Sequence, residues 1–99
     1  MSAVAVETSL PSVRLPERVT LQEAVQVLDG LNRSLAQQAG PDIVLDASGL
    51  QVFDTSAVAV LLALRRNLQQ QGKKLSVAHW PQRLSDLVKL YGVSELLNA

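Results

Sequence analysis

The middle of the chain reads IVLDASGLQVFDTSA over residues 43–57, where an apolar run gives way to the start of a helix. Residues 43–45 are apolar and rich in β-branched side chains, a pattern typical of a central strand covered on both faces. A helix is predicted to begin near Asp54 or Thr55 and to end at Gly72, because glycine commonly follows the last turn of a helix. This order of strand, connection and helix indicates an α/β fold.

Further elements are predicted on both sides of this stretch. Thr20 and Glu23 have the spacing of a capping box, so a helix is expected to begin at Thr20 and to end at Gly40-Pro41. Downstream, a strand is expected over residues 75–78 and a helix from Pro81 to Gly92. The apolar residues of the first helix recur at three- and four-residue spacing and form one stripe: Leu21, Ala24, Val25, Leu28, Leu31 and Leu35.

The two ends of the chain carry shorter patterns. Residues 3–6 and 12–15 have strand character and are separated by turn-forming residues, which predicts an N-terminal hairpin. Residues 93–97 fit either a last short helix or a strand. Together with the central elements, these patterns predict a single domain over residues 1–99. The expected fold class is α/β, with a small mixed β-sheet of about four strands packed against roughly three to four helices.

The composition excludes several classes of protein. The 99 residues are 47% hydrophobic and 18% charged, which favours a folded domain over a disordered chain. Nine basic residues balance nine acidic ones, so no overall charge attracts nucleic acid or an anionic membrane. The absence of cysteine excludes disulfides and thiolate chemistry, and no apolar run is long enough to cross a bilayer. The first residues lack the basic region of a signal peptide, so a cytoplasmic location is expected.

The predicted helix after Asp54 has apolar residues on two sides. At about 100° per residue, the sector expected to face the sheet holds Ala57, Val60, Leu61, Leu64 and Leu68. The opposite side holds Thr55, Val58, Ala59 and Leu62, and it continues as Arg65, Arg66 and Gln69. A helix of this kind needs two neighbours, so its outer side packs either on another helix of the same domain or on a partner protein.

Thr55, at the head of this outer side, has two interpretations. As a residue at or beside the N-cap, it would satisfy the first N–H groups of the helix, as Asp54 also would. The same position favours a phosphoryl group, because free N–H donors and the positive end of the helix dipole meet there, although Asp54 would repel such a group.

The sequence contains no constellation of catalytic residues. His79 is the only histidine, and the motifs of serine hydrolases, phosphate-binding loops and dinucleotide-binding folds are absent. Isolated carboxylates at strand ends are usually solvated or cap a helix, so a metal site is not expected at Asp42, Asp46, Asp54 or Asp86. We expect no catalysis, no metal and no cofactor.

Residues 43–57 resemble the central signature of STAS domains, a family of bacterial anti-sigma-factor antagonists and transporter-associated modules. The resemblance continues through the leucine-rich helix, through Gln71-Gly72-Lys73-Lys74-Leu75 and over residues 84–97, so it covers about the last 55 residues. In this family, a serine or threonine directly after the signature aspartate heads the helix and is the regulatory position, which corresponds to Thr55. The family resemblance supports the α/β fold expected from the pattern of elements.

Two branches of this family differ at the signature. Anti-sigma-factor antagonists typically read Asp-Ser-Ser-Gly, whereas this chain reads Asp54-Thr55-Ser56-Ala57. The threonine, the length and the ending Leu87-Val88-Lys89-Leu90-Tyr91-Gly92-Val93 are more similar to the MlaB-like branch. That resemblance implies a non-catalytic cytoplasmic subunit without a cofactor. It would bind the ATPase of a phospholipid-transport ABC complex that also holds a permease and a substrate-binding subunit, and so lie at the inner membrane.

The family resemblance and the two-sided helix predict the same surface. The residues expected to contact the ATPase are Thr55, Ser56, Val58, Ala59, Leu62, Arg65 and Arg66. The alternative is an anti-sigma-factor antagonist in which phosphorylation of Thr55 releases the partner through its charge and bulk.

Overall fold

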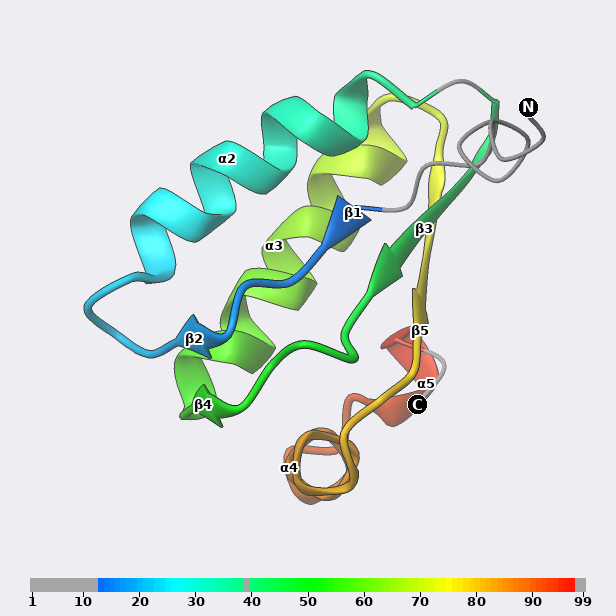
Figure 1. Ribbon diagram of the computed structural model, residues 1–99. Coiled ribbons are helices and arrows are strands. Elements are labelled where there is room, and N and C mark those ends of the chain that lie inside the picture. The colour runs from blue at the N-terminus through cyan, green and yellow to red at the C-terminus, as the bar shows by residue number, and fades with distance from the viewer. Residues whose placement is uncertain (1–12, 39, 98–99) are drawn as a thin grey trace, which may run out of the picture.

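The apolar run of residues 43–45 forms the centre of a small parallel sheet. A computed structural model of the chain describes residues 13–38 and 40–97 (Figure 1). Strand β3 (Asp42–Asp46) lies between β1 (Val13–Arg14) and β5 (Lys74–Ala78), and it is parallel to both. In this register, Ile43 lies opposite Leu75 and Leu45 lies opposite Val77. The expected strand in the middle of the fold is confirmed.

A second sheet of two residues per strand was not predicted. Strand β2 (Arg18–Val19) pairs in parallel with β4 (Val52–Phe53). Strand β4 lies between β3 and α3, where only a connection was expected. All the strand pairs in the described part of the chain are parallel, where a mixed sheet was expected. Residues 3–6 of the predicted hairpin lie outside the described residues, and β1 pairs with β3.

One side of the main sheet carries the core. Ile43 and Leu45 are fully buried, and they join residues of all four described helices in a single apolar cluster. Val44, between them, points the other way and keeps 41% of its surface exposed. The prediction that β3 is covered on both faces is therefore wrong, because the described helices bury only alternate residues of the strand.

Helix α2 (Ala24–Ala36) begins later than its capping box predicted. The Glu23 carboxylate accepts hydrogen bonds from the Thr20 N–H (2.9 Å) and from the Thr20 hydroxyl (2.6 Å). The Glu23 N–H donates to the Thr20 carbonyl, at 3.0 Å, and not to the Thr20 hydroxyl, and this bond closes a turn before the helix. The first residues of the predicted stripe consequently stay outside the core, since Leu21 is 77% exposed and Val25 is 79% exposed. The helix also ends before Gly40.

The remaining elements follow their predictions closely. Helix α3 (Thr55–Gln70) begins after Asp54 and ends just before Gly72, whose φ of +77° suits glycine. Helix α4 (Gln82–Leu90) begins after Pro81, and residues 93–97 contain a helix, α5 (Ser94–Leu97). Helix α3 contacts α2, α4, α5 and β5, so it lies at the centre of the fold (Figure 1).

Candidate partner-binding face of helix α3

The inner side of α3 is the one that the apolar spacing predicted. The five residues expected to face the sheet are all buried: Ala57, Val60, Leu61, Leu64 and Leu68. Val58 is buried as well, at 5% exposure, so at this position the outer side packs within the domain, which was one of the two alternatives. Its direction falls at the edge of the inner sector, where α4 and α5 pack against α3, and it joins Leu84, Val88 and Leu97 in the core cluster.

The solvent side of α3 is narrower than expected. Four residues point within a sector of about 60° and form what we call the α3 strip: Thr55, Ala59, Leu62 and Arg66. Thr55, Ala59 and Arg66 are exposed, whereas Leu62 is partly buried against the core. Ser56 and Arg65 are partly buried and lie beside the strip. The flanks of the helix are covered by other helices of the domain, and a central strip is left exposed, so packing on a partner remains a prediction for the strip alone.

Asp54, and not Thr55, caps the helix. One oxygen of the Asp54 carboxylate accepts a hydrogen bond from the Ser56 N–H at 2.8 Å, and the other accepts one from the Leu21 N–H at 3.2 Å. The bond from the Ser56 backbone lowers the pKa of Asp54 below its usual value of 3.8. The carboxylate is therefore ionised at neutral pH beside the Thr55 hydroxyl, and it disfavours a second negative group there.

A shallow pocket opens next to the head of the strip. It has a volume of about 400 Å³ and lies between the start of α3 and helix α4, lined by Phe53, Asp54, Thr55, Arg83, Asp86, Leu87 and Leu90. The Arg83 guanidinium lies 5.2 Å from the centre of the Phe53 ring, a cation–π distance. Leu90 is 77% exposed at the end of α4. This contribution of α4 was not predicted from the sequence.

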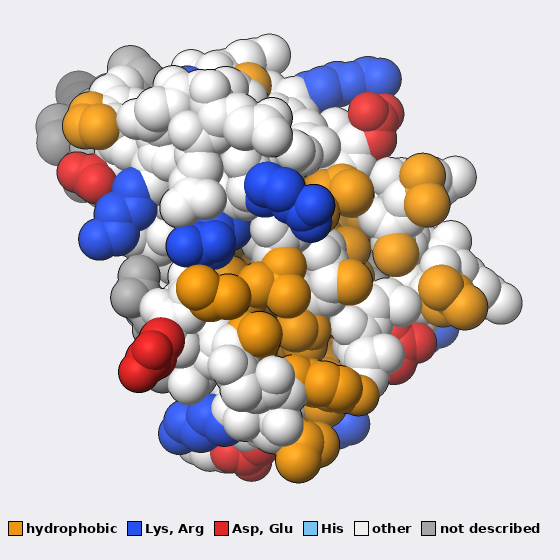
Figure 2. Space-filling model, turned by 180° about the vertical axis from the view of Figure 1, so that it is seen from behind, with side chains coloured by type: hydrophobic (Ala, Val, Ile, Leu, Met, Phe, Trp, Pro, Cys, Tyr) orange, Lys and Arg blue, Asp and Glu red, His pale blue; other side chains and the backbone are white. Residues whose placement is uncertain are grey.

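The side of the molecule on which α3 lies carries an extended apolar surface (Figure 2). On the side away from the viewer in Figure 1, where α3 lies behind β1, hydrophobic side chains gather in one continuous area. Lysine and arginine side chains border that area along one edge (Figure 2). An apolar centre with a charged rim is the usual composition of a protein–protein interface.

Some of the residues considered for catalysis or metal binding lie near one another: Asp54 and Asp86 line the same pocket, and His79 lies near Asp46. Asp46 accepts a hydrogen bond from the Ser48 N–H at 2.8 Å and pairs with Arg14 at 3.5 Å. The Ser48 backbone bond lowers the pKa of Asp46 more than the nearby charges of His79 and Arg14 do. Over residues 13–38 and 40–97, no three acidic or histidine side chains are grouped so that they could hold a metal ion.

The chain matches one known protein family. The sequence model of one family, described as MlaB, STAS domain, matches residues 2–98. No curated protein sequence matches the chain. Within the described part of the chain, every helix is too short or too polar to span a bilayer.

Proposed function

This chain belongs to the STAS domain family, and we propose that it is an MlaB-like, non-catalytic subunit of an ABC-type phospholipid transporter. In this role it binds the MlaF-like ATPase subunit through the α3 strip and supports the assembled complex of ATPase, permease and substrate-binding subunit. The complex belongs to the Mla pathway, which maintains outer-membrane lipid asymmetry. The chain is cytoplasmic and reaches the inner membrane only through this complex.

The exposed α3 strip is the observation that carries this proposal. Ala59 and Leu62 present apolar surface on a helix whose other sides are covered by α2, α4 and α5. Leu87 and Leu90 extend that surface from α4, and Arg66 lies at its polar end. The family description supports the same role, because it names MlaB among STAS domains.

Thr55 lies where the strip meets the pocket beside α4. A small neutral side chain there allows a partner to pack closely against the first turn of α3. A carboxylate at this position would lose its hydration against the partner, and burying a charge in this way destabilises a complex. In the free protein the same carboxylate would lie near the positive end of the helix dipole, so the fold would tolerate it.

The test is co-purification of the ATPase with variants at Thr55. We expect Thr55→Glu to abolish association and Thr55→Ser to retain it. Ser34→Glu is the matched control, because Ser34 is exposed on α2, on a different helix from the strip. Normal association of a folded Thr55→Glu variant would contradict the proposal.

The anti-sigma-factor antagonist remains the alternative that this test must exclude. Incubation with ATP and candidate kinases, followed by intact-mass measurement, would reveal a phosphoryl group on Thr55. Stoichiometric phosphorylation, together with release of an anti-sigma factor, would replace the transporter role. The observation against that outcome is the departure of this chain from Asp-Ser-Ser-Gly at Thr55 and Ala57.

A further inference from the structure

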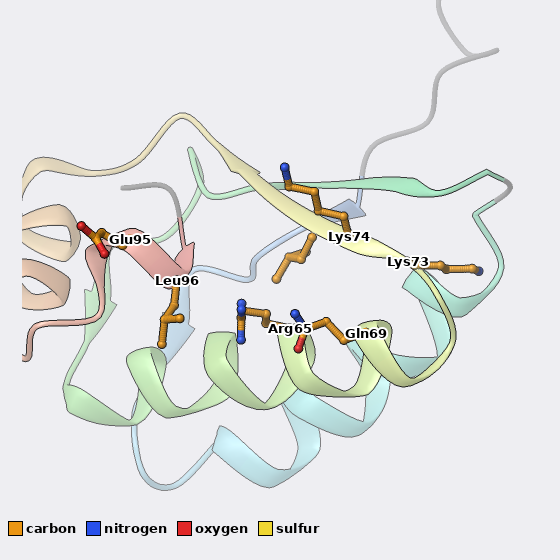
Figure 3. A pocket seen from close by; sticks show the side chains of 7 residues that line it. Arg65, Gln69, Lys73, Lys74, Glu95 and Leu96 are labelled. Carbon is orange, nitrogen blue, oxygen red and sulfur yellow. The ribbon is translucent and has the colours of Figure 1, made fainter.

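A second pocket lies at the other end of α3 from Thr55. It has a volume of about 330 Å³ and is lined by Arg65, Gln69, Lys73, Lys74, Leu75, Glu95 and Leu96. These residues come from the last turns of α3, the start of β5 and the short helix α5 (Figure 3). Its lining holds three basic residues against one acidic residue, so the pocket attracts anions.

Two of the basic side chains are directed elsewhere. The Lys73 ammonium donates hydrogen bonds to the carbonyls of Ala36 (3.1 Å) and Gln38 (3.0 Å) at the end of α2. The Lys74 side chain points away from α3, on the far side of β5 (Figure 3). Neither ammonium group is therefore turned toward the space above α3.

Arg65 is the basic residue that faces this pocket. Arg65 and Gln69 leave α3 one turn apart and point toward the side of Leu96, whereas Glu95 points away from them (Figure 3). Arg65 is partly buried, and over residues 13–38 and 40–97 its guanidinium forms no ion pair. Leu75 and Leu96 supply apolar walls. A partly buried guanidinium beside an amide donor matches the two oxygens of a carboxylate.

We propose that Arg65, assisted by Gln69, binds an aspartate or glutamate side chain of the ATPase partner. This inference rests on the proposed function and extends it, because it assigns the chemistry of the partner beside the C-terminal end of the α3 strip. Arg65 is ten residues from Thr55, about 15 Å along the helix axis, so the two ends of the interface are recognised separately. The partner would present a neutral group to Thr55 and an acidic group to Arg65.

The experiment measures the affinity of the full chain for the ATPase at several salt concentrations. We expect Arg65→Gln to weaken binding about tenfold or more and to make the affinity less dependent on salt. Arg65→Lys keeps the charge but loses the planar pair of donors, so it should recover only part of the affinity. Arg33→Gln is the matched control, because Arg33 lies on α2 and pairs with Asp29 at 3.0 Å. Thermal unfolding of each variant verifies that it is folded.

The outcomes separate this inference from the function on which it rests. Failure of the wild-type chain to bind the ATPase would overturn the proposed function itself. Binding of Arg65→Gln with wild-type affinity and salt dependence would overturn only the acidic contact. A third outcome also overturns it: Arg65→Gln keeps its affinity for the ATPase but loses flotation with phosphatidylglycerol vesicles, which would assign the anion to a lipid headgroup.

Discussion

The inner side of α3 and the α3 strip each contain a leucine, and these two leucines differ in their surroundings. Leu64, on the inner side, is fully buried in the core, whereas Leu62, two residues earlier, is only partly covered. Both are leucines on the same helix, so the difference arises from the elements packed around them. The inner side therefore stabilises the fold, while the strip is available for a partner. Substitutions on the two sides should separate stability from binding.

The largest expected effect is on the inner side. Leu64→Ala leaves a cavity against the sheet and should lower the free energy of unfolding by about 2–5 kcal/mol. Urea denaturation measures this change, and Leu62→Ala is the matched control with a smaller loss. Equal losses for the two leucines would remove the distinction between the sides.

Val58 tests where the boundary between the two sides lies. Val58→Ala removes two buried methyl groups and should lower the free energy of unfolding by about 2 kcal/mol. The folded variant should bind the ATPase as the wild type does, because Val58 is buried in the core. A variant of unchanged stability and weaker ATPase binding would instead place Val58 on the strip.

Asp54 caps the start of α3, and its contribution to the stability of the fold depends on pH. Its pKa is lowered in the folded state, so the ionised carboxylate stabilises the fold above the usual pKa of 3.8. This stabilisation is lost as the pH falls through the lowered pKa. Asn also caps helices well, so Asp54→Asn isolates the charge while Asp54→Ala removes charge and cap together.

Thermal unfolding between pH 7 and pH 2 would measure both Asp54 variants. The unfolding midpoint of Asp54→Asn should lie below that of the wild type at pH 7, and the gap should close in acid. Asp54→Ala should stay below Asp54→Asn throughout. A gap between wild type and Asp54→Asn that widens in acid would contradict the lowered pKa.

The smallest effect on stability is expected on the strip. Arg66 is exposed, so Arg66→Ala should change the free energy of unfolding by no more than about 0.5 kcal/mol. The same urea titration measures it. A loss comparable to that of Val58→Ala would show that the strip supports the fold and is not reserved for a partner.

Periodicity in the sequence predicted most of α3 but not its flanks. The spacing of Ala57, Leu61 and Leu64 identified the inner side, because the sheet they contact lies directly beneath the helix. The burial of Val58 was not predicted because the helices α4 and α5 lie about thirty residues later in the chain. A helical wheel describes directions around one helix, and it contains nothing about neighbours that arrive from elsewhere.

Other elements could not be predicted from the sequence for different reasons. Strands β2 and β4 have two residues each, too few to show an alternating pattern. The start of α2 was misplaced because the Glu23 N–H bonds the Thr20 carbonyl instead of the hydroxyl, so that residues 20–23 form a turn before the helix. The pocket at Arg65 depends on α5 and β5 meeting α3, which only the folded chain reveals.

The central place of α3 has a mechanical consequence. The other described helices and β5 all pack against α3. A partner bound to α3 would therefore contact the helix that holds these elements together. Because α3 is already fixed in the folded domain, binding to it should cost little conformational entropy. Force transmitted through the ATPase would then move the whole small domain as one stiff body.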